Sequence, residues 1–132
     1  MRSTLILAVL MSAVAFPAVA QVTEEQLAAA QKLYDETEVT AESALSLYCG
    51  AAFTLVANQA TADGKADDAT QAKALADALL IKAEELLIAE GMADADRTLL
   101  AEAYTYVANA GVMLETQEAE YTQEECIAAA GQ

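Results

Sequence analysis

The sequence predicts an all-α fold, a small bundle of four longer helices and a short C-terminal helix, closed by one disulfide. After residue 20 the chain is rich in Ala, Leu and Glu, which favour helices, and it contains no proline. Its apolar residues recur at spacings of three and four, with no strand-like alternation. Two cysteines, Cys49 and Cys126, are expected to pair in an oxidising compartment.

Residues 1–20 have the features of a secretory signal peptide. A basic residue is followed by an apolar run, and Ala18 and Ala20 match an A-x-A cleavage site. The run stops at a proline and is shorter than the roughly 20 residues that a membrane span needs. We therefore expect cleavage before Gln21, export to the periplasm or beyond, no stable membrane insertion afterwards, and a single helical domain over 21–132.

Two capping signals mark the first two helices. Thr23 and Gln26 form a capping box, in which each side chain bonds the other residue's backbone NH. That helix should end near 35–38, where acidic and β-branched residues weaken it. Thr40 then caps a second helix, which we expect to run to about residue 60 and to lie at the centre of the fold.

One apolar face of the second helix carries the first cysteine. The face is formed by residues at spacings of three and four, namely Leu45, Tyr48, Cys49, Ala52, Phe53 and Val56. Cys49 is therefore predicted to be buried. Gly50 beside it would let another helix approach closely, and 61–64 reads as a loop.

The third helix is predicted over 67–90, and Gly91 fits the left-handed residue that ends a helix. Its core stripe is unusually wide because Leu80, Ile81 and Ile88 extend the apolar surface beyond one face. A helix of this kind is either the central member of a bundle or carries an exposed patch used for binding. The sequence alone leaves both alternatives open.

The fourth helix should begin near Asp94 or Asp96 and run through Leu114. Gly111 inside it suggests a kink or a close helix crossing. Residues 115–121 are polar and are expected to be frayed helix or linker.

The last helix opens with a second capping box, formed by Thr122 and Glu125. A helix this short is marginal in water, so something must hold it down. A bond from Cys126 to Cys49 would do so. A redox-active pair is less consistent with the sequence, because the two cysteines are far apart and have no basic neighbours that would lower a thiol pKa.

Charge limits the classes of partner. After removal of the signal peptide, five basic residues stand against 21 acidic ones, a net charge of −16. Such a surface is solubilising and excludes nucleic acid, which is bound by clustered Lys and Arg. A charged partner is expected to be basic, either a basic protein or a cation.

Motifs for chemistry are missing. The chain has no histidine, no haem-attachment sequence and no Gly-rich phosphate loop, so we expect no cofactor and no catalytic site. The carboxylates at 63–68 and 94–96 lack the spacing of a calcium loop and are explained as helix caps, so no metal site is predicted. A carboxylate-based metal-binding protein or enzyme remains the second alternative.

Non-catalytic binding of a protein partner, as by an inhibitor, immunity protein or adaptor, is the function that we expect. The candidate interface residues are apolar or aromatic, namely Leu80, Ile81, Ile88, Tyr104 and Tyr106. The first alternative is an acid-stress periplasmic chaperone whose carboxylates are protonated at low pH, which would loosen the bundle and bare Leu80, Ile81 and Ile88. In architecture the chain resembles small periplasmic disulfide-bonded helical proteins, among them acid-stress chaperones and immunity proteins against toxins.

Overall fold

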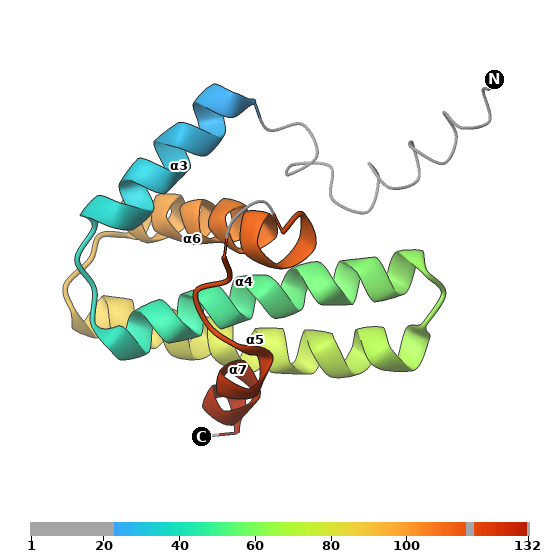
Figure 1. The fold of residues 1–132 in the computed structure, drawn as a ribbon. Helices are drawn as coiled ribbons and strands as arrows, with labels where there is room; N and C mark the ends of the chain where they lie inside the picture. Colours follow the sequence, from blue (N-terminus) through green and yellow to red (C-terminus); the bar gives the residue numbers. More distant parts are fainter. Residues whose placement is uncertain (1–22, 116–117, 132) are drawn as a thin grey trace.

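The computed structural model describes residues 23–115 and 118–131 (Figure 1). The predicted signal peptide and its cleavage site lie outside the described residues. Within them the all-α prediction is confirmed, with four longer helices, one short C-terminal helix and no strand. These are α3 (Glu24–Glu36), α4 (Ala41–Ala62), α5 (Ala66–Ala89), α6 (Asp94–Ala108) and α7 (Gln123–Ala130), with a π-helical turn, η1 (Asn109–Met113), continuing α6.

The predicted helix starts are confirmed. At α3 the Gln26 backbone NH donates to Thr23 Oγ1 at 3.1 Å, and the Thr23 NH donates to the Gln26 side chain at 3.0 Å. The same reciprocal pair forms between Thr122 and Glu125 at α7. Thr40 caps α4 by accepting from the Ser43 NH. Local sequence therefore fixes where these three helices begin.

Two glycines end the paired helices α4 and α5. Gly64 has φ +76° and Gly91 has φ +84°, the left-handed region that a residue with a Cβ adopts only with strain. In both turns the NH of the glycine and the NH of the residue after it donate to carbonyls in the last turn of the helix, as in a Schellman motif. The prediction for Gly91 is confirmed. The loop predicted over 61–64 is shorter, because the turn at Gly64 lets α4 continue through Ala62.

Helix α4 is the centre of the fold. It pairs antiparallel with α5 along its length, and α6 and α7 also pack against it (Figure 1). Twelve of its residues are buried, against five in α5. The wide apolar surface of α5 therefore does not make α5 the enclosed member of the bundle, because one of its faces stays exposed.

The larger core cluster lies where α4, α5 and α6 meet. Leu47, Leu55, Leu87 and Leu100 are each at most 3% exposed there. Helix α3 packs on α6 and covers this side of the cluster. At the α3–α6 contact the ring centroids of Tyr34 and Tyr104 lie 4.6 Å apart. Large side chains thus fill the space between three helices.

The disulfide organises the second core cluster, on the side of α7. Cys49 and Cys126 are bonded, with their Cα atoms 5.2 Å apart and 77 positions between them in the sequence. Phe53, Leu79 and Ala129 pack around the bond. Cys49 is fully buried, as its position on the apolar face of the second helix predicts. The bond fits an oxidising compartment outside the cytoplasm.

The fourth helix ends earlier than predicted. It changes at Asn109 to a π-helical turn, in which the Leu114 NH donates to the Asn109 carbonyl at 2.9 Å, so the α-helix does not reach Leu114. Gly111 lies inside this turn, and a Cβ there would come within 2.8 Å of Tyr48 Oη and 3.1 Å of the Ala119 Cα. The close approach inferred for Gly111 is therefore present, with the Tyr48 hydroxyl of α4 and with the backbone of 118–119, and it lies within the π-helical irregularity that ends α6.

Polar bonds fix the end of the hairpin opposite Gly64. The Glu90 carboxylate, at the end of α5, accepts from the NH and hydroxyl of Thr40, both at 3.3 Å, and from the hydroxyl of Ser43. It thereby caps α4 from fifty positions away. Nearby, Arg97 donates to Glu84, Asp94 and the Met92 carbonyl, linking α5 to the start of α6.

None of the described helices combines the length and the hydrophobicity that a membrane crossing requires.

Candidate functional site

The predicted interface residues on α5 lie on different sides of that helix. Ile81 and Ile88 are 61% and 54% exposed on the outer face of the helix, two turns apart, with the exposed Glu84 and Glu85 between them. Leu80 points instead toward α4, where its side chain takes the space that a Cβ at Gly50 would occupy, 2.7 Å from Leu80 Cδ2. This contact explains why residue 50 is a glycine. Ile81 and Ile88 are already exposed in the folded protein, so low pH is not needed to expose them.

The two predicted tyrosines on α6 are also separated. Tyr104 is only 3% exposed because it packs on Tyr34 in the core, which corrects the expected surface position of Tyr104. Tyr106 is partly exposed beside a hollow of about 190 Å³ between α3 and α6, and its hydroxyl donates to Glu102 at 3.4 Å. The five candidate interface residues therefore form no single surface.

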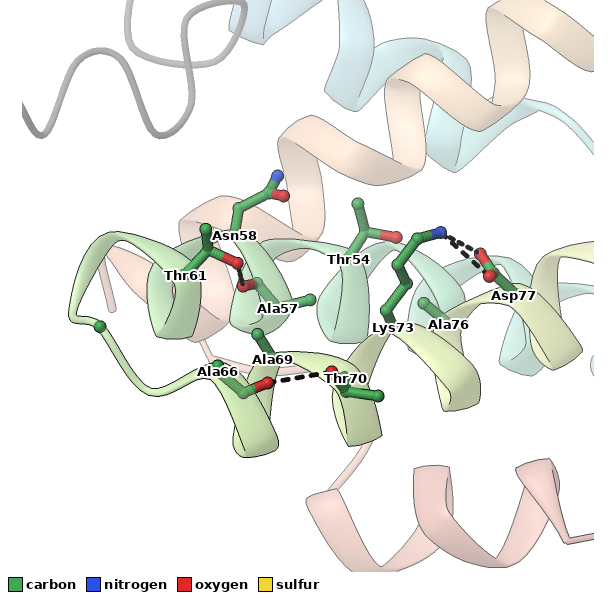
Figure 2. A pocket seen from close by; sticks show the side chains of 11 residues that line it. Thr54, Ala57, Asn58, Thr61, Ala66, Ala69, Thr70, Lys73, Ala76 and Asp77 are labelled. Carbon is green, nitrogen blue, oxygen red and sulfur yellow. Dashed lines mark hydrogen bonds and ion pairs between the residues drawn. The ribbon is translucent and has the colours of Figure 1, made fainter.

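A larger hollow lies at the far end of the α4–α5 hairpin. We call it the hairpin groove; it has a volume of about 470 Å³ (Figure 2). It is lined by the last two turns of α4 and the first three of α5, including Thr54, Ala57, Asn58, Thr61, Ala66, Ala69, Thr70, Lys73, Ala76 and Asp77. Helix α6 packs on the hairpin over 47–55 and 83–87 and does not extend along this end (Figure 1).

The lining of the hairpin groove is mostly apolar although it contains three threonines. Each threonine hydroxyl donates to a carbonyl four residues earlier in its own helix, at 2.8 Å for Thr54, 2.9 Å for Thr61 and 3.0 Å for Thr70. Figure 2 shows the last two of these bonds. The hydroxyls are therefore occupied, and the groove presents carbon-rich, small side chains.

Acidic side chains surround the hairpin groove. Asp63, Asp67 and Asp68 are exposed at the tip of the hairpin, and Asp77 stands at the other end of the groove. Lys73 pairs with Asp77, one turn further along α5, at a distance of 3.0 Å (Figure 2). This exposed ion pair contributes little stability, and the local field stays negative because carboxylates outnumber lysines here as in the whole chain.

The titratable groups with clearly shifted pKa values are tyrosines, and four of them lie in the core region between the helices. Burial raises the pKa of Tyr104 to about 12 and that of Tyr34 further. Burial also raises the pKa of Tyr48 and Tyr121, and the Glu120 carboxylate acts in the same direction on all four rings. Phenols protonated this firmly are structural groups at neutral pH and not general bases.

No three Cys, Asp or Glu side chains gather closely enough to hold a metal ion in the part of the chain that the structure describes. The arrangement there offers shape, apolar contact and negative charge. These are the properties of a binding surface.

Sequence reasoning missed the hairpin groove, although a signal for it exists. Between Ala57 and Ala74 the sequence contains no Leu, Ile, Val, Met, Phe or Tyr. Two paired helices without large apolar side chains cannot fill the space between them and a third element. Such a stretch within an otherwise Leu-rich bundle predicts an open groove.

Comparison with protein-family models, with curated proteins and with solved structures finds no match to the chain.

Proposed function

We propose that this protein binds a basic protein partner without catalysis, and that the partner places a helix in the hairpin groove. One observation carries the proposal: side chains of α6 cover the hairpin at 47–55 and 83–87, whereas the hairpin groove at the Gly64 end is lined mainly by small side chains and is open. A partner helix that lies in the hairpin groove would cover these small side chains.

The packing of α6 suggests the apolar side of the partner. Leu100, Tyr104 and Val107 of α6 lie against small and large residues of α4 and α5 and are buried there. The hairpin groove is lined mainly by Ala and Thr and has no large apolar side chain, so its own side chains leave room. A partner helix with Leu, Met or aromatic residues at helical spacing would fill it.

Charge suggests the polar side of the partner. Carboxylates stand at both ends of the hairpin groove, and the expected mature chain carries a net charge of −16. Lys and Arg on the partner would be attracted, which speeds association and makes it sensitive to salt. Ile81, one helical turn beyond Asp77, extends the apolar surface along α5 and could meet the same partner.

Two synthetic amphipathic helices test the proposal. Both carry the same Leu face, and their polar faces are built from Lys in one and from Glu in the other. We expect the Lys peptide to bind with an affinity that falls as salt rises, and the Glu peptide to bind at least about tenfold more weakly. Equal binding of the two peptides, or no binding of either, would count against a basic helical partner.

A matched pair of variants locates the binding. Ala69→Leu fills the hairpin groove, and Ala74→Leu makes the same change on an exposed position of α5 that does not line it. We expect Ala69→Leu to weaken binding of the Lys peptide about tenfold or more and Ala74→Leu to leave it unchanged. If both variants bind alike, the hairpin groove is not the site.

A further inference from the structure

A second cavity lies on the other side of α4 from the hairpin groove. It has a volume of about 340 Å³ and forms where η1 and the 119–123 segment pass over the middle of α4. We call it the aromatic pocket, and its principal lining residues are Tyr48, Phe53, Val56, Val112, Tyr121 and Cys126. Val56 and Thr54 are two positions apart on a helix and therefore face about 200° apart, so the two sites are separate.

The aromatic pocket is held by specific contacts. The disulfide fixes Cys126 at its floor, where Tyr48 and Phe53 are at most 8% exposed. The ring of Tyr121 meets that of Tyr48 edge to face, with their centroids 5.5 Å apart. The Glu120 NH donates to Tyr48 Oη at 3.2 Å, which ties the covering segment to α4.

Glycine at position 111 contributes to the same arrangement. A side chain there would strike Tyr48 Oη and the backbone of Ala119, pushing the covering segment away from α4. The π-helical turn that contains Gly111 also places Val112 in the wall of the pocket. Turns of this type are frequent at functional sites.

The electrostatics of the aromatic pocket favour a positive ligand. Its most accessible aromatic ring is that of Tyr121, whose face is negative, and none of the described lining residues is Lys or Arg. The carboxylates of Glu120 and Glu125 act on Tyr121, whose pKa they raise after the larger effect of burial. Their field would repel an anion at the same place.

From this geometry we infer that the aromatic pocket binds an organic cation of the alkylammonium class. The alkyl groups would lie against Val56 and Val112, and the positive head would face the partly exposed ring of Tyr121. Cation–π attraction supplies the preference for charge, and the apolar walls supply the rest. A volume of about 340 Å³ is within the range of small-molecule sites.

Choline and 3,3-dimethylbutan-1-ol are the matched probes. They have the same shape, and they differ in that a quaternary nitrogen in choline replaces a quaternary carbon, so their comparison isolates the charge. Each probe is titrated into the disulfide-bonded chain that begins at Gln21, and binding is measured by calorimetry. We expect choline to bind at least about fivefold more tightly than the alcohol. Equal affinities would show a pocket for neutral apolar molecules and overturn the inference, as would the absence of binding by choline.

Variants place the cation. Tyr121→Phe keeps an aromatic ring and should retain the preference for choline, whereas Tyr121→Leu should reduce choline affinity severalfold without changing that of the alcohol. Glu120→Gln should also lower the affinity for choline. Glu102→Gln removes the same charge from α6 and should leave that affinity unchanged. A Tyr121→Leu protein that melts normally and binds choline as before would refute the inference. The hairpin-groove variant Ala69→Leu should leave choline binding unchanged, so the two proposals can fail separately.

Discussion

The two halves of the α4–α5 hairpin are built from the same pair of helices and differ in what covers them. In the half nearer Thr40, α6 covers the pair, and Leu47, Leu55, Leu87 and Leu100 are buried in the space between. In the half nearer Gly64, the lining consists mainly of Ala and Thr, and the groove is open. Side-chain size along one hairpin therefore separates a region that forms the core from a region that stays open.

The comparison indicates which part of the hairpin contributes most to the stability of the fold. Burial of large apolar side chains is the dominant source of stability. The covered half provides most of it, and the open half, with small side chains, provides little. Substitutions that act on each half should differ accordingly.

Loss of the disulfide should have the largest effect, because it acts on the whole fold. In the simple chain-entropy treatment, a disulfide that joins residues 77 positions apart lowers the entropy of the unfolded chain and so stabilises the fold by at most about 4.5 kcal/mol. Replacing both Cys49 and Cys126 by Ala should lower the free energy of unfolding by a few kcal/mol in urea titrations. An unchanged midpoint would mean that α7 is held by its packing alone.

Truncation in the covered half comes next. Leu100 is 1% exposed between α6 and α4, so Leu100→Ala should destabilise by about 3 kcal/mol through lost burial and the cavity left behind. Chemical denaturation measures the change. A cost below about 1 kcal/mol would show that α6 is loosely seated and would remove the contrast between the halves.

Alkaline pH should act on the covered half, where Tyr104 is buried. Its folded pKa is about 12, above the unfolded value of about 10, so the folded state holds the phenol proton more firmly. The stabilisation is complete below about pH 10 and is lost as pH rises toward 12, on the order of 2 kcal/mol for this residue. Melting curves against pH should show the fall, and Tyr104→Phe should reduce it more than Tyr106→Phe does.

The smallest effect is expected in the open half. Thr70 lines the hairpin groove, is exposed, and its hydroxyl bonds only within α5. Thr70→Ala should therefore change the free energy of unfolding by less than about 0.5 kcal/mol. A loss comparable with that of Leu100→Ala would contradict the division into a covered and an open half.

Much of the fold follows from local signals in the sequence. The capping boxes at Thr23 and Thr122, the cap at Thr40 and the left-handed Gly91 set helix boundaries because their chemistry is contained within a few residues. The pairing of Cys49 and Cys126 follows from the number of cysteines. These features need no knowledge of how the helices pack.

The features that depend on packing were missed or misplaced. Apolar character alone cannot separate Tyr104, which is buried under α3, from Ile81, which faces solvent. Leu80 was grouped with Ile81 because neither spacing nor composition shows that Gly50 lies opposite it. The early end of α6 coincides with the close approach of Gly111 to Tyr48, 63 positions away in the sequence. Such distant contacts are invisible to local patterns.

The hairpin is fixed at one end by the turn at Gly64 and at the other by Glu90, which bonds Thr40 and Ser43. With both ends held, α4 and α5 cannot slide past one another. Substitutions at Ala69 or Thr70, which line the groove and are at least partly exposed, would then alter the contour of the exposed channel without disturbing the interior. A lineage of such proteins could vary the shape of this channel while its melting temperature stays nearly constant.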